Sequence, residues 1–155
     1  MNTDGNSAVE MLTADQCWEL LASMSVGRLA VIVDGHPDIF PVNYVVDERT
    51  VVFRTAPGTK LDGVHTSNPV ALEVDGYDKA ENLAWSVVLR GVAEEHTRPI
   101  GPYESALVSS LPWQAGEKNH IVRITTLNLS GRRFTATRPD IWSAPANDPR
   151  RAVFE

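Results

Sequence analysis

A short stretch from Arg54 to Lys60 gathers the donor groups that a phosphate needs. A run of β-forming residues ends at Arg54 and Thr55, a Pro-Gly pair turns the chain, and Thr59 and Lys60 begin the next element. Cations, hydroxyl groups and the free N–H groups at a possible helix start suit a phosphate dianion. The same residues could form an exposed hairpin edge, because Arg and Lys are mostly solvated in proteins. The residue types alone leave both interpretations open.

The elements around this stretch are predicted to be mainly short strands. A first helix is expected to begin at Thr13, where Thr13 and Gln16 match a capping box and apolar residues follow at helical spacing. A second helix is expected over 102–111. Six strands are predicted from β-rich runs over 29–33, 39–46, 51–55, 70–74, 85–95 and 120–129, the last continuing over 131–134. Gly91 within the fifth strand predicts a bulge or bend.

The links between these strands indicate an antiparallel architecture. Asp34-Gly35 between the first two strands is a strong hairpin signal. Short strands joined by hairpins, with helices only as inserts, predict an all-β dominated fold that closes into a small barrel. No Rossmann glycine fingerprint or Walker loop occurs in the sequence. We expect a polar N-terminal arm over 1–12, one barrel domain over 13–137 and an irregular C-terminal arm over 138–155.

Composition narrows the partners and the compartment. The 155-residue chain has a formal net charge of −6 and a pI near 5.2, which argues against nucleic acid as the main partner. Its one cysteine, Cys17, cannot form an internal disulfide and fits a reducing compartment. The polar N-terminus does not have the pattern of a signal peptide, and no apolar run is long enough to span a membrane. We therefore expect a soluble, cytoplasmic protein.

Four motifs in order resemble the flavin-binding split barrels of the pyridoxamine 5'-phosphate oxidase-like family. The motifs are Pro-Val-Asn-Tyr at 41–44, the stretch at 53–61, Asn-Pro-Val-Ala-Leu-Glu-Val-Asp at 68–75, and Trp-Ser-Val-Val-Leu-Arg-Gly at 85–91. The chain is most similar to the small nitroimidazole-reductase-like and actinobacterial-type members. The resemblance implies an antiparallel six-stranded FMN-binding split β-barrel with short helices, working as a homodimer with the cofactor in clefts between subunits.

The resemblance also implies which residues contact FMN. Thr55, Thr59 and Lys60 would contact its phosphate, with Arg54 nearby. The isoalloxazine ring would lie along three residues of the second strand, and two residues of the fifth strand would line the same pocket. These residues are Val42, Asn43 and Tyr44 in the second strand, and Trp85 and Ser86 in the fifth.

The expected activity is that of a flavin-dependent oxidoreductase acting on a small, planar substrate. Pyridoxamine phosphate is not the expected substrate, because the family's true oxidases carry cations where this chain has Val42 to Val45. No catalytic side chain can be named, since a flavin itself carries out the redox step. The histidines have no paired ligand spacing and are expected at the surface, so no metal site is predicted. The alternatives are a deazaflavin-dependent reductase and a non-catalytic flavin- or haem-binding module.

Overall fold

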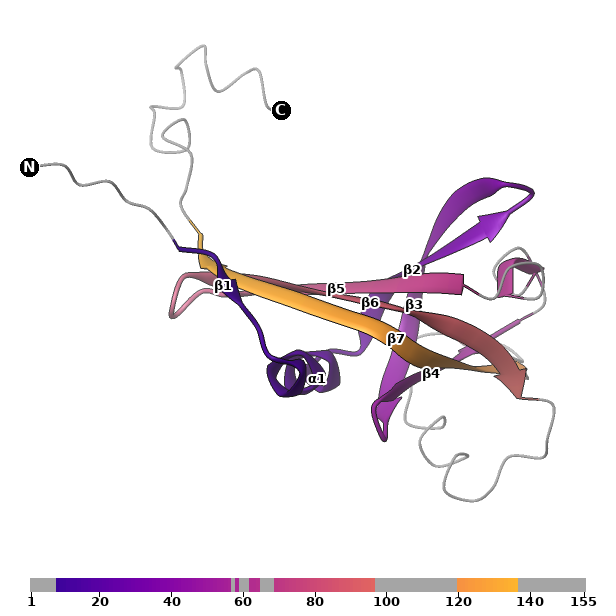
Figure 1. Ribbon diagram of the computed structural model, residues 1–155, viewed down its shortest axis with the longest axis horizontal. Helices are drawn as coiled ribbons and strands as arrows, with labels where there is room; N and C mark the ends of the chain where they lie inside the picture. The colour runs from indigo at the N-terminus through magenta and orange to yellow at the C-terminus, as the bar shows by residue number, and fades with distance from the viewer. Residues whose placement is uncertain (1–7, 57, 59–61, 65–68, 97–119, 137–155) are drawn as a thin grey trace, which may run out of the picture.

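A computed structural model describes residues 8–56, 58, 62–64, 69–96 and 120–136. Its elements are β1 (Glu10–Met11), α1 (Ala14–Ser23), β2 (Val26–Val33), β3 (His36–Asp47), β4 (Thr50–Thr55), β5 (Pro69–Asp78), β6 (Leu83–His96) and β7 (His120–Thr135). The strands pair antiparallel in the order β1-β7-β4-β3-β2-β5-β6, and an additional pairing of β6 with β7 closes the sheet (Figure 1). The predicted split β-barrel is therefore confirmed.

The described strands number seven rather than the six predicted. The additional strand, β1, lies where a polar arm was expected and pairs with Arg132 and Arg133 near the end of β7. A strand of two residues is too short to show the alternation of apolar and polar residues by which strands are predicted. Its strand conformation depends on pairing with β7. The helix expected over 102–111 lies outside the described residues.

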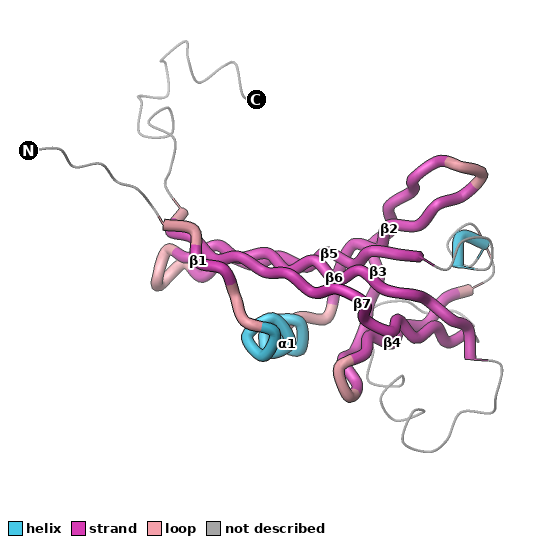
Figure 2. Tube along the Cα trace, viewed as in Figure 1, coloured by secondary structure: helices cyan, strands magenta, loops and turns pink. Residues whose placement is uncertain are grey.

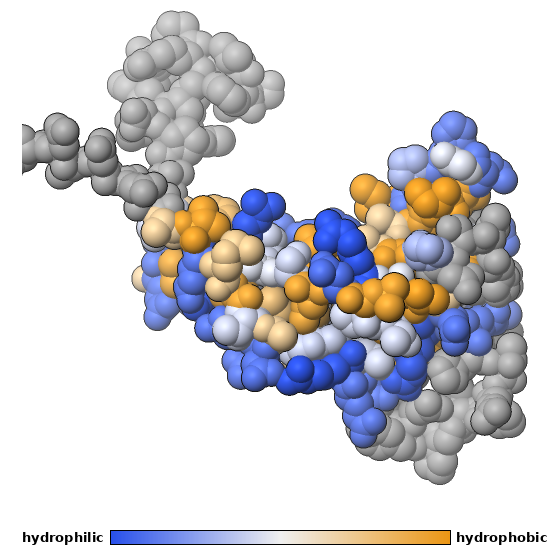
Figure 3. Space-filling model, viewed as in Figure 1, coloured by the Kyte–Doolittle hydropathy of each residue, from blue (hydrophilic) through white to orange (hydrophobic). Residues whose placement is uncertain are grey.

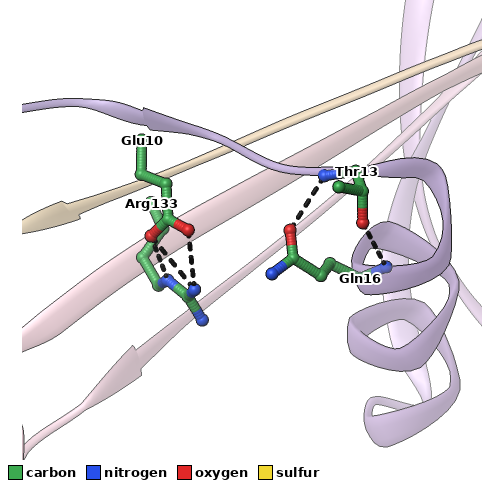
Figure 4. A network of polar contacts seen from close by, with 4 residues as sticks. All are labelled: Glu10, Thr13, Gln16 and Arg133. Atoms are coloured by element: carbon green, nitrogen blue, oxygen red, sulfur yellow. Dashed lines mark hydrogen bonds and ion pairs between the residues drawn. The ribbon is translucent and has the colours of Figure 1, made fainter.

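Helix α1 begins as its capping box predicts. The Thr13 hydroxyl accepts a hydrogen bond from the Gln16 backbone N–H at 3.2 Å, and the Gln16 side chain accepts one from the Thr13 N–H at 2.9 Å (Figure 4). Just before the helix, Glu10 accepts two hydrogen bonds from the Arg133 guanidinium at 3.1 and 3.2 Å. Together these contacts fix the chain as it passes from β1 into α1.

The core lies between the inward faces of the strands and helix α1. Tyr44 of β3 and Phe53 of β4 are its largest fully buried side chains. On the helix side, Cys17 packs so close to β7 that a Cβ on Gly131 would lie 2.6 Å from its sulfur. Burial raises the pKa of the Cys17 thiol. A larger residue at position 131 would therefore have to displace the Cys17 side chain.

A bend at Gly91 divides the long β6–β7 pair. The register shifts between Arg90 and Gly91, which confirms the predicted bulge. A Cβ at Gly91 would lie 2.2 Å from the backbone oxygen of Thr125, so the two backbones approach too closely for a side chain. On one side of the bend the strands close the barrel, and on the other β5, β6 and β7 run on together as a long ribbon (Figure 2).

Candidate functional site

The turn predicted to bind phosphate begins at the end of β4. Arg54 and Thr55 lie opposite Ile121 and His120 at the start of β7. The Thr55 side chain is buried, and its hydroxyl donates to the Ala56 carbonyl at 3.1 Å. Thr59 and Lys60, the other two predicted phosphate ligands, lie outside the described residues. The structure thus places the first half of the predicted phosphate site at the end of the barrel where β4 and β7 meet.

The predicted ring-contacting residues of β3 point to two different faces. Val42 and Tyr44 are buried in the core, and the Tyr44 hydroxyl donates a 2.6 Å hydrogen bond to the Leu21 carbonyl. This burial raises the pKa of the Tyr44 phenol. Adjacent strand residues face opposite sides, so Asn43 points away from the core. Of the three residues, only Asn43 presents a side chain to the outer face, and Val42 and Tyr44 could contact a ligand there only through their backbones.

Asn43 has an unsatisfied acceptor. Its side-chain oxygen Oδ1 is buried and has no hydrogen-bond partner. Such a group is costly unless a donor reaches it, so a bound molecule with an N–H group would satisfy it. Asn43 and Arg54 each lie one residue beyond the facing pair Tyr44–Phe53, which puts both on the outer face where the β3–β4 pairing ends. The structure therefore places a residue predicted to contact the ring beside a residue predicted to lie near the phosphate.

Ser86 and Trp85 belong to β6 and lie beside the C-terminal end of β7, away from the end where β7 meets Thr55. Ser86 faces Arg132 and Trp85 faces Arg133, whereas Thr55 faces His120. Along β7 the twelve residue-to-residue steps from His120 to Arg132 cover roughly 40 Å at about 3.3 Å per step. No FMN molecule could bridge that distance with its short ribityl chain. Within one chain, the structure does not bring these two residues to the predicted phosphate turn.

A groove of about 760 Å³ lies beside Ser86 on the ribbon. Its lining residues are Val9, Asp75, Gly76, Tyr77, Ala84, Trp85, Ser86, Arg132 and Phe134. The sequence analysis did not group these residues. Three strands each contribute two of them, spaced two positions apart, so that both side chains of a strand point to the same face: Asp75 and Tyr77, Ala84 and Ser86, Arg132 and Phe134. Only the strand registers show that these pairs lie side by side.

His120 also differs from the expectation of a surface histidine. It is half-buried at the start of β7, and its Nδ1 contacts the Glu95 carboxylate. Sequence spacing gave no sign of this contact, because Glu95 and His120 come from strands far apart in the chain. Among the described residues, no group of three His, Cys, Asp or Glu side chains could hold a metal ion.

The split barrel points to the class of protein. The family model for pyridoxamine 5'-phosphate oxidase matches residues 13–133, and the chain belongs to this family. An FAD-binding protein from Mycobacterium smegmatis is 38% identical with a TM-score of 0.59, the match covering 82% of this chain and 99% of that one. An FAD-binding protein from Mesorhizobium loti is 28% identical with a TM-score of 0.73, covering 83% and 99%. An uncharacterized protein from Mycobacterium tuberculosis is 39% identical over 90 residues, which are 58% of this chain and 80% of the relative.

No helix in the described part of the chain is long and apolar enough to cross a lipid bilayer.

Proposed function

We propose that this protein binds FMN and is an oxidoreductase for a small, planar substrate. The observation that carries the proposal is the unsatisfied Asn43 Oδ1 on the outer face beside Arg54. A flavin ring has an N–H that could donate to this oxygen, and Arg54 begins the turn with phosphate-binding chemistry. Bound FMN would supply hydride or electron transfer, while the protein orients it and forms the substrate pocket.

In this proposal, each residue of the phosphate turn has a separate role. Lys60 and Arg54 supply positive charge and Thr59 supplies a hydroxyl donor. The buried Thr55 hydroxyl donates to the Ala56 carbonyl in the structure, so Thr55 would have to give up that hydrogen bond to donate to a phosphate. Pyridoxamine phosphate is not the proposed substrate, because its phosphate would need a further cluster of cations beside that of FMN. Apart from Arg54, the outer face of this part of the sheet carries Arg123, which lies opposite Val52 and is already bound to Asp47 at 2.9 Å and to Thr50 at 2.6 Å.

The proposed working unit is a homodimer in which the flavin contacts both copies. The roughly 40 Å between the phosphate turn and Ser86 means that Ser86 and Trp85 could reach the cofactor only from a second copy. The β2–β3 hairpin also exposes Ile32 and Ile39, and hydrophobic atoms lie over it in the space-filling view (Figure 3). Exposed aliphatic side chains of this kind favour association.

The dimer is tested by sedimentation of the purified protein at micromolar concentration. We expect a dimer that binds FMN. A folded monomer that retains full flavin affinity would contradict a site shared between copies.

The cofactor is tested by the visible spectrum and by flavin titration. We expect flavin absorption bands, and we expect Lys60→Ala to weaken FMN binding by about 1.5 to 3 kcal/mol without affecting riboflavin, which has no phosphate. Lys79→Ala, in the exposed turn after β5, is the matched control. A Soret band, or a variant that loses FMN and riboflavin equally, would contradict the assignment.

FAD is the second candidate cofactor, because two similar proteins bind it. Titration with FAD in parallel decides between them. Tighter binding of FAD than of FMN would replace FMN in the proposal.

A further inference from the structure

The groove on the β5–β6–β7 ribbon is built from two cross-strand rows of side chains. In the first row, Tyr77 faces Ala84 and Ala84 faces Phe134. In the second, Asp75 faces Ser86 and Ser86 faces Arg132. Directly opposed residues share a face of the sheet, so all six side chains stand on one surface. They account for most of the groove's lining.

The first row forms a slot with aromatic walls and a small floor. Neighbouring strands lie about 4.8 Å apart, which puts the backbones of Tyr77 and Phe134 about 10 Å apart with Ala84 between them. A ring placed midway would lie about 5 Å from each wall, within the usual range of aromatic stacking. Tyr77 is held in place at the edge of the slot, because its hydroxyl donates to the Asn82 side-chain oxygen at 2.6 Å. The slot therefore has room for one planar ring.

The second row gives the groove one cation, Arg132, and one carboxylate, Asp75. Asp75 is paired with Arg28, whose Nη2 lies 2.8 Å from its Oδ1 and whose Nε also contacts Glu73, so the carboxylate is held away from Arg132 in its own ion pair. Arg132 is exposed and has no ion-pair partner among the described residues, whereas Arg133 next to it is paired with Glu10. Residues two apart along a strand lie about 7 Å from each other, so Arg132 and the Ser86 hydroxyl are within reach of a substituent on a ring in the slot.

We infer that this groove binds a planar aromatic molecule carrying one negative charge, such as an aromatic carboxylate. The ring lies between Tyr77 and Phe134 over Ala84, and the carboxylate accepts hydrogen bonds from Arg132 and Ser86. One unpaired cation suits a monoanion rather than a phosphate dianion. That this ligand is the substrate rests on the proposed function, because only in the dimer would the groove lie beside the flavin. The binding itself does not depend on a flavin.

Calorimetric titration of the full-length protein with 2-naphthoate tests the inference, with neutral 2-naphthamide as the comparison ligand. We expect Arg132→Gln to weaken 2-naphthoate at least tenfold and to leave 2-naphthamide unchanged, as expected for one charge-assisted hydrogen bond. Arg133→Gln is the matched control and should change neither. Ala84→Leu fills the floor of the slot and should abolish binding of both ligands, with thermal melting used to verify folding.

Three outcomes would overturn the inference. Arg132→Gln and Arg133→Gln could act alike, or the wild-type protein could bind neither ligand. In addition, 2-naphthoate could be displaced by FMN in a one-to-one competition, which would mean that the groove holds the cofactor. If instead the proposed function is wrong, the protein would bind no flavin but would still bind 2-naphthoate, and Arg132→Gln would still weaken that binding.

Discussion

Replacing Tyr44 with phenylalanine removes one hydroxyl from the core and tests how α1 is attached to the barrel. The hydroxyl donates a 2.6 Å hydrogen bond to the Leu21 carbonyl in the last turn of α1, and the side chain is only 1% exposed. The other hydrogen bond to that carbonyl is a weak one from the Met24 N–H at 3.4 Å. Loss of the hydroxyl would leave a buried carbonyl nearly unsatisfied, which costs about 1 to 2 kcal/mol.

The control is the same substitution at an exposed tyrosine. Tyr77 also donates a 2.6 Å hydrogen bond, to Asn82, but it is 48% exposed, so water can replace the lost partner. By urea denaturation we expect Tyr44→Phe to lower the free energy of unfolding by about 1 to 2 kcal/mol, and Tyr77→Phe by less than about 0.5 kcal/mol. For a chain of this size the first change lowers Tm by about 2 to 8 °C. Equal losses in the two variants would refute the burial argument.

The pH dependence gives a second test of the same hydrogen bond. Burial raises the pKa of Tyr44, so the folded state holds the phenolic proton more tightly than the unfolded state. The resulting stability is fully present below the unfolded pKa of about 10 and is lost as the pH rises above it. Tyr44→Phe has no such proton, so its difference from the wild-type protein should shrink above about pH 10. A constant difference across this range would contradict the assignment.

Two more predictions concern the bend and the buried thiol. Gly91→Ala should destabilise the protein by about 3 kcal/mol in urea denaturation, because its Cβ would meet the Thr125 carbonyl, and a loss no greater than that of Gly35→Ala would contradict this. Gly35 has a positive φ of 76° in an open turn, where alanine costs about 1 kcal/mol in backbone strain. Cys17 should react with a thiol reagent only as fast as the protein unfolds, since it is buried with a raised pKa. Rapid labelling under native conditions would show that α1 opens locally.

Features with local causes could be predicted from the sequence. The capping box of α1 depends on Thr13 and Gln16 alone, and the structure contains both of its hydrogen bonds. The hairpin at Asp34-Gly35 and the bulge at Gly91 depend on residues suited to unusual backbone geometry, and both occur where expected. Antiparallel neighbours in sequence are also neighbours in space, so the β2–β3–β4 meander followed directly from its turns.

Features set by distant partners could not be predicted. The motif at 41–44 contains Val42, Asn43 and Tyr44, but only the fold shows that the Tyr44 ring lies in the core while Asn43 faces outward. The contact between Glu95 and His120 and the two rows of the groove depend on the register of β6 with β7, which are joined through a long connection. A sequence motif therefore predicted a group of site residues without showing which of their side chains point outward.

The geometry of β7 also limits how a shared site could be arranged. The end of β4 that leads into the predicted phosphate turn lies beside the start of this strand and the groove lies near its end, and the bend at Gly91 sets the direction of one relative to the other. In a two-fold symmetric dimer the same surfaces are exchanged between copies, so each copy would give its turn to one site and its groove to the other. The proposed dimer would then hold two equivalent sites, and a change in the bend would disturb both. The close backbone contact at Gly91 would in this way influence both proposed sites.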